Sequence, residues 1–250
     1  MSANAILADM GRCIGCQACV VACKTGRELG PNETTIHIRE EIQGTFPKLW
    51  GTFMHHRCFH CAEAACVAVC PTGALSKVDG LTAVDLTKCT GCAYCVDACP
   101  YHIPTIYDGR VSKCAGCTDL IADGKEPFCV QTCPSHALEF GPRDEMVALA
   151  QARVGELRRT QPDAQVYGLT QLGGLGTLFV LPAAAGVFGL PENPDIPKSI
   201  GVWKQGVQTG AEGLGVLALL AAGLAFIVAR RNHRREKAAH AAGAAAGKEQ

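Results

Sequence analysis

Residues 13–23 read CIGCQACVVAC, and residues 89–99 repeat the same cysteine pattern as CTGCAYCVDAC. Both stretches have the spacing C-x2-C-x2-C-x3-C. The chain has 250 residues and 16 cysteines, and every cysteine lies between residues 13 and 133. The cysteines form four groups of four: Cys13, Cys16, Cys19 and Cys23; Cys58, Cys61, Cys66 and Cys70; Cys89, Cys92, Cys95 and Cys99; and Cys114, Cys117, Cys129 and Cys133. The fold must therefore accommodate four sets of four thiols.

This spacing is the one with which bacterial ferredoxins bind [4Fe–4S] clusters, the fourth cysteine serving the neighbouring cluster. A proline follows the last cysteine of three groups, at Pro71, Pro100 and Pro134, as in those proteins. Four groups predict four [4Fe–4S] clusters bound by all sixteen cysteines. Because the redox chemistry of such a protein belongs to its cofactors, we expect an electron carrier without catalytic residues of its own.

Two other uses of cysteine fit the pattern less well. Three thiols at two-residue intervals are poorly placed for three disulfides, because each bridge needs its own close approach of two Cβ atoms. Structural zinc sites commonly use two C-x2-C pairs, and the fourth group, C-x2-C-x11-C-x3-C, is compatible with one. A single zinc or three-iron site within the set, and a membrane-anchored zinc-binding scaffold as the whole protein, remain alternatives.

The formal net charge is zero, with 23 basic and 23 acidic residues, and gives no indication of a nucleic-acid partner. A basic residue directly precedes the first cysteine of every group: Arg12, Arg57, Lys88 and Lys113. Two interpretations are open. These residues are solvated surface charges, or each offsets the negative charge of a nearby cluster and raises its reduction potential.

Residues 1–142 are predicted to form the cluster-binding domain. It contains a repeat, because CPTGAL at residues 70–75 resembles CPSHAL at residues 133–138. Each copy predicts a cysteine run, a short helix, a Cys-Pro turn and a short strand. We therefore expect an α+β fold of two ferredoxin-like modules, each with two [4Fe–4S] clusters. Residues 24–57 are an insertion with strand-like patches at 34–38 and 46–53.

Residues 143–205 are predicted to be an amphipathic helix followed by a connector. Apolar residues recur at helical spacing within residues 143–159: Met146, Leu149, Ala150, Val154 and Leu157. Residues 160–205 are rich in glycine and proline. The uncharged stretch 172–190 is long enough to cross a membrane, but its glycines and Pro182 disfavour a spanning helix.

Residues 206–230 are the predicted transmembrane helix. Within 207–229 the one charged residue is Glu212, and 23 residues of helix extend about 34 Å. Residues 231–250 form a basic and alanine-rich tail, and we expect the part after Lys237 to be disordered or weakly helical. Five Lys or Arg residues in 230–237 predict a cytoplasmic C-terminus.

This topology predicts a single-pass inner-membrane protein with its cluster domain on the periplasmic side. Residues 1–16, MSANAILADMGRCIGC, lack the features of a signal peptide. We therefore expect export together with a partner that carries a signal.

With four cysteine groups and one C-terminal apolar segment, the chain resembles the iron–sulfur (β) subunits of membrane-bound respiratory formate dehydrogenases. These belong to the four-cluster electron-transfer subunits of molybdopterin oxidoreductases. Similar segments include GPRDEM at 141–146, VYG at 166–168, Gly173-Gly174, Leu190-Pro191 and WKQG at 203–206. The resemblance covers nearly the whole chain. It departs in the shorter insertion at 24–57 and in the absence of proline after Cys23.

The resemblance implies that the groups pair first with fourth and second with third, with exchanged fourth cysteines. Cys92, which some relatives replace, is present, so four [4Fe–4S] clusters are expected. The implied ligand sets are Cys13, Cys16, Cys19 and Cys133; Cys114, Cys117, Cys129 and Cys23; Cys58, Cys61, Cys66 and Cys99; and Cys89, Cys92, Cys95 and Cys70. His55, His56 and His60 flank the second group, and we expect them on the surface or supporting the cysteines.

The resemblance also implies partners. A molybdenum- or tungsten-pterin catalytic subunit would oxidise formate, and a cytochrome b subunit in the lipid bilayer would pass the electrons to quinone. The electron-transfer subunit of a quinone-linked hydrogenase, or of another molybdopterin oxidoreductase, is the alternative in the same class. A self-sufficient oxidoreductase is disfavoured, because no glycine-rich nucleotide loop is recognisable.

Overall fold

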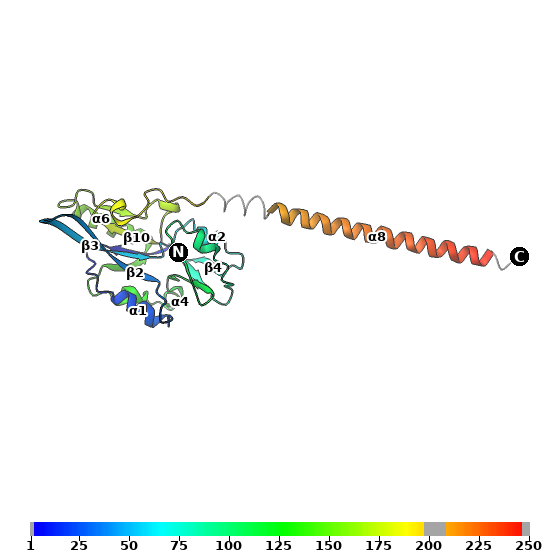
Figure 1. Cartoon of the computed structure of the whole chain (residues 1–250), viewed down its shortest axis with the longest axis horizontal. Coiled ribbons are helices and arrows are strands. Elements are labelled where there is room, and N and C mark those ends of the chain that lie inside the picture. The colour runs from blue at the N-terminus through cyan, green and yellow to red at the C-terminus, as the bar shows by residue number, and fades with distance from the viewer. Residues whose placement is uncertain (1–2, 198–208, 247–250) are drawn as a thin grey trace. The chain divides into compact units, whose positions relative to one another are not determined.

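The structure is a computed structural model that describes residues 3–197 and 209–246 (Figure 1). The chain divides into a compact unit, Met1–Pro197, and a second unit, Lys198–Gln250. The elements of the compact unit are β1 (Asn4–Asp9), α1 (Ala18–Gly26), β2 (Ile36–Thr45), β3 (Lys48–Arg57), α2 (Ala65–Ala68), β4 (Leu75–Val78), β5 (Leu81–Val84), α3 (Tyr94–Asp97), β6 (Thr105–Tyr107), β7 (Arg110–Ser112), α4 (Thr118–Ala122), α5 (Phe128–Gln131), β8 (Leu138–Pro142), α6 (Arg143–Leu157), β9 (Gln165–Tyr167), η1 (Gln171–Gly173), β10 (Thr177–Leu181) and η2 (Ala185–Phe188). The described part of the second unit contains α8 (Thr209–Ala246).

A four-stranded sheet in the order β8-β1-β10-β9 forms the centre of the compact unit. β1 pairs in parallel with β10 and antiparallel with β8, and β10 pairs antiparallel with β9. The inner strands β1 and β10 read NAILAD and TLFVL and are buried almost throughout. Continuous apolar runs of this kind are expected for strands that are covered on both faces.

Helix α6 covers one face of this sheet. Its residues Met146, Ala150 and Val154 pack against Leu7 of β1 and Leu178 of β10. These residues recur on one face because an α-helix repeats every 3.6 residues. The sequence predicted this helix over residues 143–159, and the structure ends it at residue 157.

Leu149 departs from the predicted apolar stripe, since its side chain is 45% exposed. Viewed down the helix axis at 100° per residue, Leu149 lies about 60° outside the arc that the buried residues Met146 to Val154 span. The partly buried Val147 packs at the other edge of that arc.

The segment predicted as a connector, residues 160–205, contains β9 and the inner strand β10. The reason is local. Thr177–Leu181 is a short apolar run bounded by Gly176 and Pro182, which fits a buried strand better than a helix. The uncharged stretch 172–190 is therefore occupied by a strand and two 3₁₀ helices rather than by a membrane-spanning helix.

The opposite face of the sheet meets the cysteine-bearing segments. Ala8, Phe179 and Leu181 alternate with the residues that face α6, because successive side chains of a strand point to opposite faces. They share one core with Cys19 and Cys129. The sheet thus separates α6 from the thiols.

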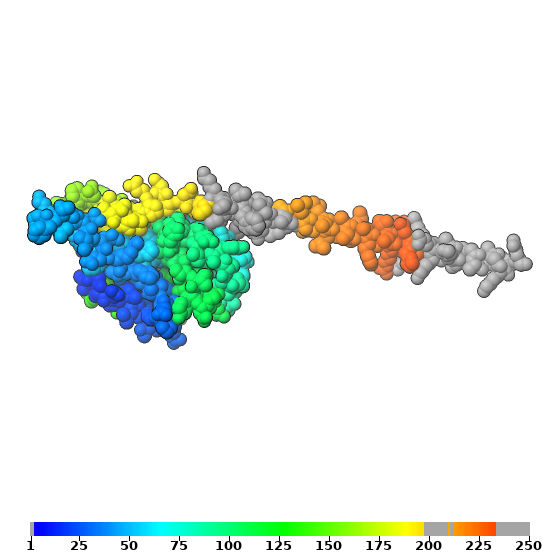
Figure 2. Space-filling model, in the orientation of Figure 1, coloured from blue at the N-terminus to red at the C-terminus, as the bar shows by residue number. Residues whose placement is uncertain are grey.

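The insertion at 24–57 is built around a long hairpin. β2 and β3 pair antiparallel, with Ile36 opposite Arg57 at one end and Thr45 opposite Lys48 at the other. Phe46 and Pro47 form the turn between them. The second predicted strand patch, 46–53, thus begins in the turn, and both strands are longer than predicted. The hairpin projects from the compact unit (Figure 2). Its end exposes Ile42, Phe46 and Leu49.

The residue after Cys23 also affects the insertion. Without a proline there, α1 continues through Cys23 to Gly26 instead of turning. Lys24 then fixes the following loop, because its Nζ donates to the carbonyl oxygens of Gly30, Pro31 and Glu33 at 2.6–2.9 Å.

Helix α8 contains a stretch, Gly213–His233, that is long and apolar enough to cross a membrane. Twenty-one residues of helix extend about 32 Å. Its described side chains, including Leu217, Leu220 and Phe226, are exposed. An apolar helix with this exposure can serve as a membrane anchor. The start of the predicted span, 206–208, lies outside the described residues.

The alanine-rich residues after Lys237 belong to α8, which continues to Ala246. Alanine is the strongest helix former and lets the helix extend past the apolar stretch. Residues 247–250 lie outside the described residues. The mixture of short helices and strands, with one apolar C-terminal helix, agrees with the predicted α+β fold.

We expect Leu178→Ala to lower the free energy of unfolding by about 2–5 kcal/mol, because it leaves a cavity between the sheet and α6. The matched control is Leu49→Ala at the exposed end of the hairpin, which should stay within about 0.5 kcal/mol. Thermal unfolding of the full chain in detergent measures both, and Tm should fall by about 4–20 °C for Leu178→Ala alone. Equal effects of the two substitutions would contradict the role of the sheet as the core.

Candidate iron–sulfur centres

Each cysteine group opens with a tight loop that needs a positive φ directly before the second cysteine. Gly15, Gly91 and Gly116 occupy this position in three groups, with φ between 67° and 75°. His60 occupies it in the remaining group, with a φ of 52°. Glycine adopts this conformation freely, whereas a residue with a Cβ does so at a cost of roughly 1–2 kcal/mol.

A short helix then carries the next cysteine of each group. Cys19 lies on α1, Cys66 on α2, Cys95 on α3 and Cys129 on α5. In the two repeated hexads, the chain passes a Cys-Pro turn after α2 and α5 and enters β4 and β8. This is the order that the repeat predicted.

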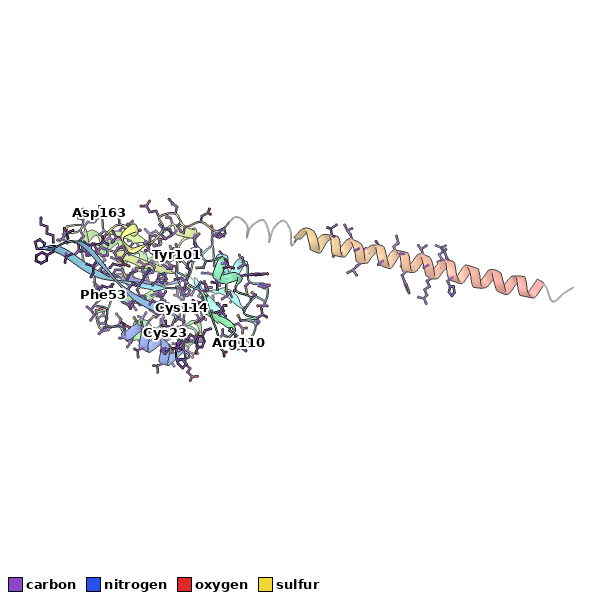
Figure 3. The ribbon with its side chains drawn as sticks, viewed as in Figure 1. Cys23, Phe53, Tyr101, Arg110, Cys114 and Asp163 are labelled. Carbon is purple, nitrogen blue, oxygen red and sulfur yellow. The ribbon has the colours of Figure 1, made fainter. Side chains whose placement is uncertain are left out.

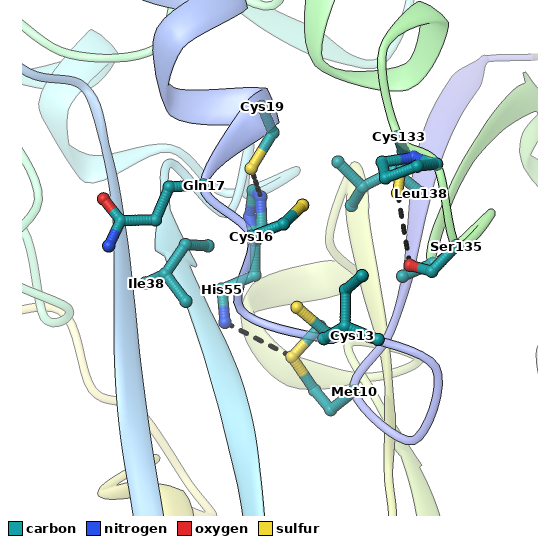
Figure 4. A pocket seen from close by; sticks show the side chains of 13 residues that line it. Met10, Cys13, Cys16, Gln17, Cys19, Ile38, His55, Cys133, Ser135 and Leu138 are labelled. Carbon is teal, nitrogen blue, oxygen red and sulfur yellow. Dashed lines mark hydrogen bonds between the residues drawn. The ribbon is translucent and has the colours of Figure 1, made fainter.

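The first set of thiols, site A, is brought together by the central sheet. Ala8 of β1 pairs with Leu138 of the antiparallel β8. Cys13 follows Ala8 by five residues and Cys133 precedes Leu138 by five, so both lie beyond the same end of the strand pair. Cys13, Cys16, Cys19 and Cys133 line one cavity with about 360 Å³ of empty space (Figure 4).

Site D repeats this arrangement on a smaller scale. Leu75 of β4 pairs with Val84 of β5. Cys70 precedes Leu75 by five residues, and Cys89 follows Val84 by five. The cavity beyond this strand pair has about 320 Å³ of empty space and is lined by Cys70, Cys89, Cys92 and Cys95.

Site C depends on an aromatic contact. The rings of Phe59 and Tyr101 stack with centroids 3.9 Å apart and planes within 5°. This contact brings the loop that follows Cys99 onto the loop that begins the second group. Cys58, Cys61, Cys66 and Cys99 line a cavity with about 390 Å³ of empty space.

Site B lies where α1 meets α5, and Figure 3 labels two of its residues, Cys23 and Cys114. A charge on Cys114 would raise the pKa of Cys23, and charges on Cys114 and Cys117 would raise that of Cys129, so these sulfurs lie near one another. All four thiols are buried. Thr35 Oγ1 lies 3.3 Å from Cys23 Sγ and secures its position.

Neighbouring sites are also close to one another. Cys19 of site A and Cys129 of site B interact electrostatically, as do Cys66 of site C and Cys95 of site D. Sites B and C are joined by Lys113, whose Nζ lies 3.7 Å from Cys58 Sγ and 2.7 Å from the Cys114 carbonyl oxygen. These interactions make site A a neighbour of site B, site B of site C and site C of site D, which is the order of a row.

The thiols of three sites lie around a cavity. Four sulfurs bound to one zinc at 2.3 Å lie about 3.8 Å apart. Within the described residues, no group of three or more His, Cys, Asp or Glu side chains is close enough to hold one ion. All sixteen cysteines are free thiols. Thiols placed around a cavity fit a [4Fe–4S] cluster.

Burial raises the pKa of several thiols, because desolvation penalises the thiolate. The pKa reaches about 12 for Cys19 and Cys66, with burial as the largest cause in each. The same cause raises the pKa of Cys23 and of Cys95 to about 11. Thiolates are the ligands of iron–sulfur clusters. Burial thus opposes the formation of thiolates at these positions, and the positive charge of bound iron would favour it.

Several sulfurs accept hydrogen bonds from the surrounding protein. His55 Nε2 lies 3.3 Å from Cys19 Sγ, and the Val111 N–H donates to Cys89 Sγ at 3.3 Å. The Thr82 N–H donates to His60 Nδ1 at 2.9 Å. The proton of neutral His60 is therefore on Nε2, which lies 3.5 Å from the sulfur of Cys114 in site B. Hydrogen bonds to cluster sulfurs help to set reduction potentials.

Both histidines are buried and neutral. Burial lowers the pKa of His55 and of His60, and the nearby charge of Arg57 lowers both further. We expected the histidines either to lie on the surface or to support the cysteines. His55 and His60 support the cysteines. The signal available in the sequence was the histidine in Cys58-Phe59-His60-Cys61, where the other groups have glycine.

The two ends of the row are open to solvent. Of the sixteen cysteines, Cys16 in site A and Cys92 in site D are the exposed ones. Exposed apolar side chains lie two residues away in the sequence, Ile14 from Cys16 and Tyr94 from Cys92. The thiols of the inner sites, B and C, are buried or half-buried.

Two family models, each described as a 4Fe-4S dicluster domain, match residues 12–74 and 50–143. Together they cover all sixteen cysteines. The sequence is 35% identical to the formate dehydrogenase-O iron–sulfur subunit of Escherichia coli (strain K12), over 87% of this chain and 80% of that protein.

A second relative, the formate dehydrogenase iron–sulfur subunit of Haemophilus influenzae, is 33% identical over 85% of this chain and 77% of its own length. The B subunit of anaerobic dimethyl sulfoxide reductase from Escherichia coli (strain K12) is 40% identical, over 55% of this chain and 73% of that protein. The similarity to the formate dehydrogenase subunits thus extends over more of the sequence.

Proposed function

This protein belongs to the family of formate dehydrogenase iron–sulfur subunits, and we propose that it relays electrons from a formate-oxidising catalytic subunit to the membrane. That subunit would hold a molybdenum or tungsten pterin, and a cytochrome b subunit would receive the electrons and pass them to quinone. The observation that carries the proposal is the arrangement of twelve thiols around three cavities, with the four thiols of site B gathered where α1 meets α5. Electron transfer through [4Fe–4S] clusters is the activity that these sites serve.

The ligand sets that we propose are the four sites: Cys13, Cys16, Cys19 and Cys133 in site A; Cys114, Cys117, Cys129 and Cys23 in site B; Cys58, Cys61, Cys66 and Cys99 in site C; and Cys89, Cys92, Cys95 and Cys70 in site D. Three cavities support this assignment directly, since each is lined by the thiols of one set. Mutual electrostatic effects among the thiols support site B. Each site thus takes its fourth cysteine from another group.

The proposed path follows the row from site A to site D, or the reverse. Site A and site D each have one exposed cysteine, Cys16 or Cys92, at which a partner can approach. The inner sites are kept away from solvent. The protein's own residues therefore hold the clusters in order and leave two ends available for exchange with other subunits.

The first test is formate-dependent dye reduction by the detergent-solubilised complex, isolated through a tag on this chain. We expect a brown complex with formate dehydrogenase activity. A brown complex that is inactive with formate but active with hydrogen would favour the hydrogenase alternative, and activity with a sulfoxide would favour a reductase. A colourless protein that contains zinc would contradict the iron–sulfur assignment itself.

Exchange of the fourth cysteines makes a second prediction. Cys133→Ser should damage the cluster of site A and largely spare that of site B, because Cys133 lines the site A cavity. The matched variant Cys23→Ser should do the opposite. EPR spectra of the reduced complexes distinguish the two signals, and the reverse pattern would show that each group keeps its own fourth cysteine.

We further propose that the cluster domain lies on the periplasmic side of the inner membrane and the C-terminus in the cytoplasm. The support is the run of Lys and Arg in residues 230–237, which overlaps the C-terminal end of the apolar stretch Gly213–His233 of α8. In intact spheroplasts, added protease should digest the cluster domain and leave a C-terminal tag intact. Protection of the cluster domain, with cleavage only after lysis, would reverse the orientation.

A further inference from the structure

We propose that Arg57 and Lys113 form a crossed pair of buried cations between sites B and C. Arg57 precedes a cysteine of site C but raises the reduction potential of the cluster in site B. Lys113 precedes a cysteine of site B but raises the reduction potential of the cluster in site C. This inference rests on the proposed cluster sites.

Arg57 is the last residue of β3, and its side chain is 1% exposed. Nη1 donates to Cys129 Sγ at 3.1 Å, and Nη2 donates to Cys114 Sγ at 3.6 Å. Among the described residues, no carboxylate forms an ion pair with it. A buried charge is costly unless it is paired, so this guanidinium points to an anionic group at site B.

Lys113 is 5% exposed and follows β7 directly. Its Nζ donates to the carbonyl oxygens of Thr82 at 3.0 Å and Cys114 at 2.7 Å, and to Cys58 Sγ at 3.7 Å. The ion pairs found among the described residues do not include Lys113. Its charge is therefore directed at site C without a compensating carboxylate.

The crossing has a simple backbone cause. Successive residues of an extended chain point to opposite sides. At the end of β3, Cys58 turns into site C, so Arg57 points the other way, towards site B. After β7 the same alternation turns Cys114 into site B and directs Lys113 towards site C.

The two other basic residues at this sequence position act differently. Arg12 pairs with Asp9 and Glu139, and Lys88 pairs with Asp85. Both basic side chains are exposed. From the sequence, the four basic residues are either surface charges or neighbours of clusters. In the structure Arg12 and Lys88 are surface charges, and Arg57 and Lys113 lie beside the proposed cluster sites.

Two further cations lie near the inner sites, and both are compensated or solvated. Arg27 donates to the two carboxylate oxygens of Asp119 at 2.7 and 2.6 Å. Lys77 is exposed, and its Nζ donates to the carbonyl oxygens of His60, Cys61 and Gly80. Arg57 and Lys113 are thus the buried and uncompensated pair.

The effect on potential follows from Coulomb's law. Reduction adds one negative charge to a cluster, and a nearby cation stabilises the reduced form more than the oxidised form. Solvent screens this interaction little at a buried site. Removing the cation therefore lowers the reduction potential of the cluster that it faces.

The test is an EPR-monitored redox titration of the detergent-solubilised complex that contains the full chain. Cys117→Ser and Cys61→Ser identify the signals of sites B and C. Arg57→Gln removes the charge and should lower the equilibrium constant for reduction of the site B cluster at least tenfold. For a one-electron couple this is a fall of about 59 mV in the reduction potential. The site C cluster should shift less. Arg57→Lys keeps the charge and should recover most of the potential.

The reciprocal variant, Lys113→Gln, should lower the potential of site C more than that of site B. The matched control, Lys88→Gln, removes a surface cation at the equivalent sequence position and should leave all potentials unchanged. If Arg57→Gln prevents cluster assembly, Arg57→Lys and Lys113→Gln still decide the question.

A larger shift at site C than at site B in Arg57→Gln would overturn the crossed assignment, and unchanged potentials in both glutamine variants would overturn the inference as a whole. Normal [4Fe–4S] signals in the unaltered complex would leave the proposed function standing in either case. Absence of any such signal would instead overturn the proposed function, and the inference with it.

Discussion

Each proposed cluster site needs thiols from more than one segment of the sequence, and at sites A and D the pairing of strands brings these segments together. Site A joins Cys13 to Cys133, and the register of β1 against β8 places both beyond the same end of the sheet. A shift of that register would displace one cysteine relative to the other. The central sheet is therefore a positioning device as well as a core. The segments that stabilise it, β10 and α6, support the sites without contributing a ligand.

The local geometry of the sites could be predicted from the sequence, and the long-range part could not. The cysteine spacing, the glycine before the second cysteine and the Cys-Pro turns are local signals, and the structure follows them. β10 was missed because an inner strand covered on both faces lacks the alternating pattern that identifies a strand. Its parallel partner, β1, lies about 170 residues away, a separation at which propensity gives no information. The left-handed backbone of His60 was not predicted, because a positive φ at a residue with a Cβ has no sequence signal beyond the missing glycine.

Burial and charge depend on each other in the inner sites. The protein places thiols where desolvation disfavours the thiolate, and places Arg57 and Lys113 where desolvation disfavours a cation. Although burial alone lowers the pKa of Arg57, the charges of Cys129 and Cys114 reverse this effect and leave its pKa raised. Neither charge is stable there without the other. Because a bound cluster keeps its cysteines as thiolates, cluster binding would contribute to the stability of this part of the fold, as metal binding does in other small domains.

The distribution of burial along the row of sites matches what a carrier of electrons requires. Electrons should leave the row at its ends, where we propose that partners bind, and not along its length. Site B is enclosed by α1, α5 and the base of the β2–β3 hairpin, and Tyr101 stacks on Phe59 in the wall of site C. At sites A and D, by contrast, Cys16 and Cys92 reach the surface near apolar side chains. A partner that covers such a surface also excludes water from it. Docking of partners would therefore enclose sites A and D, as the fold itself encloses sites B and C.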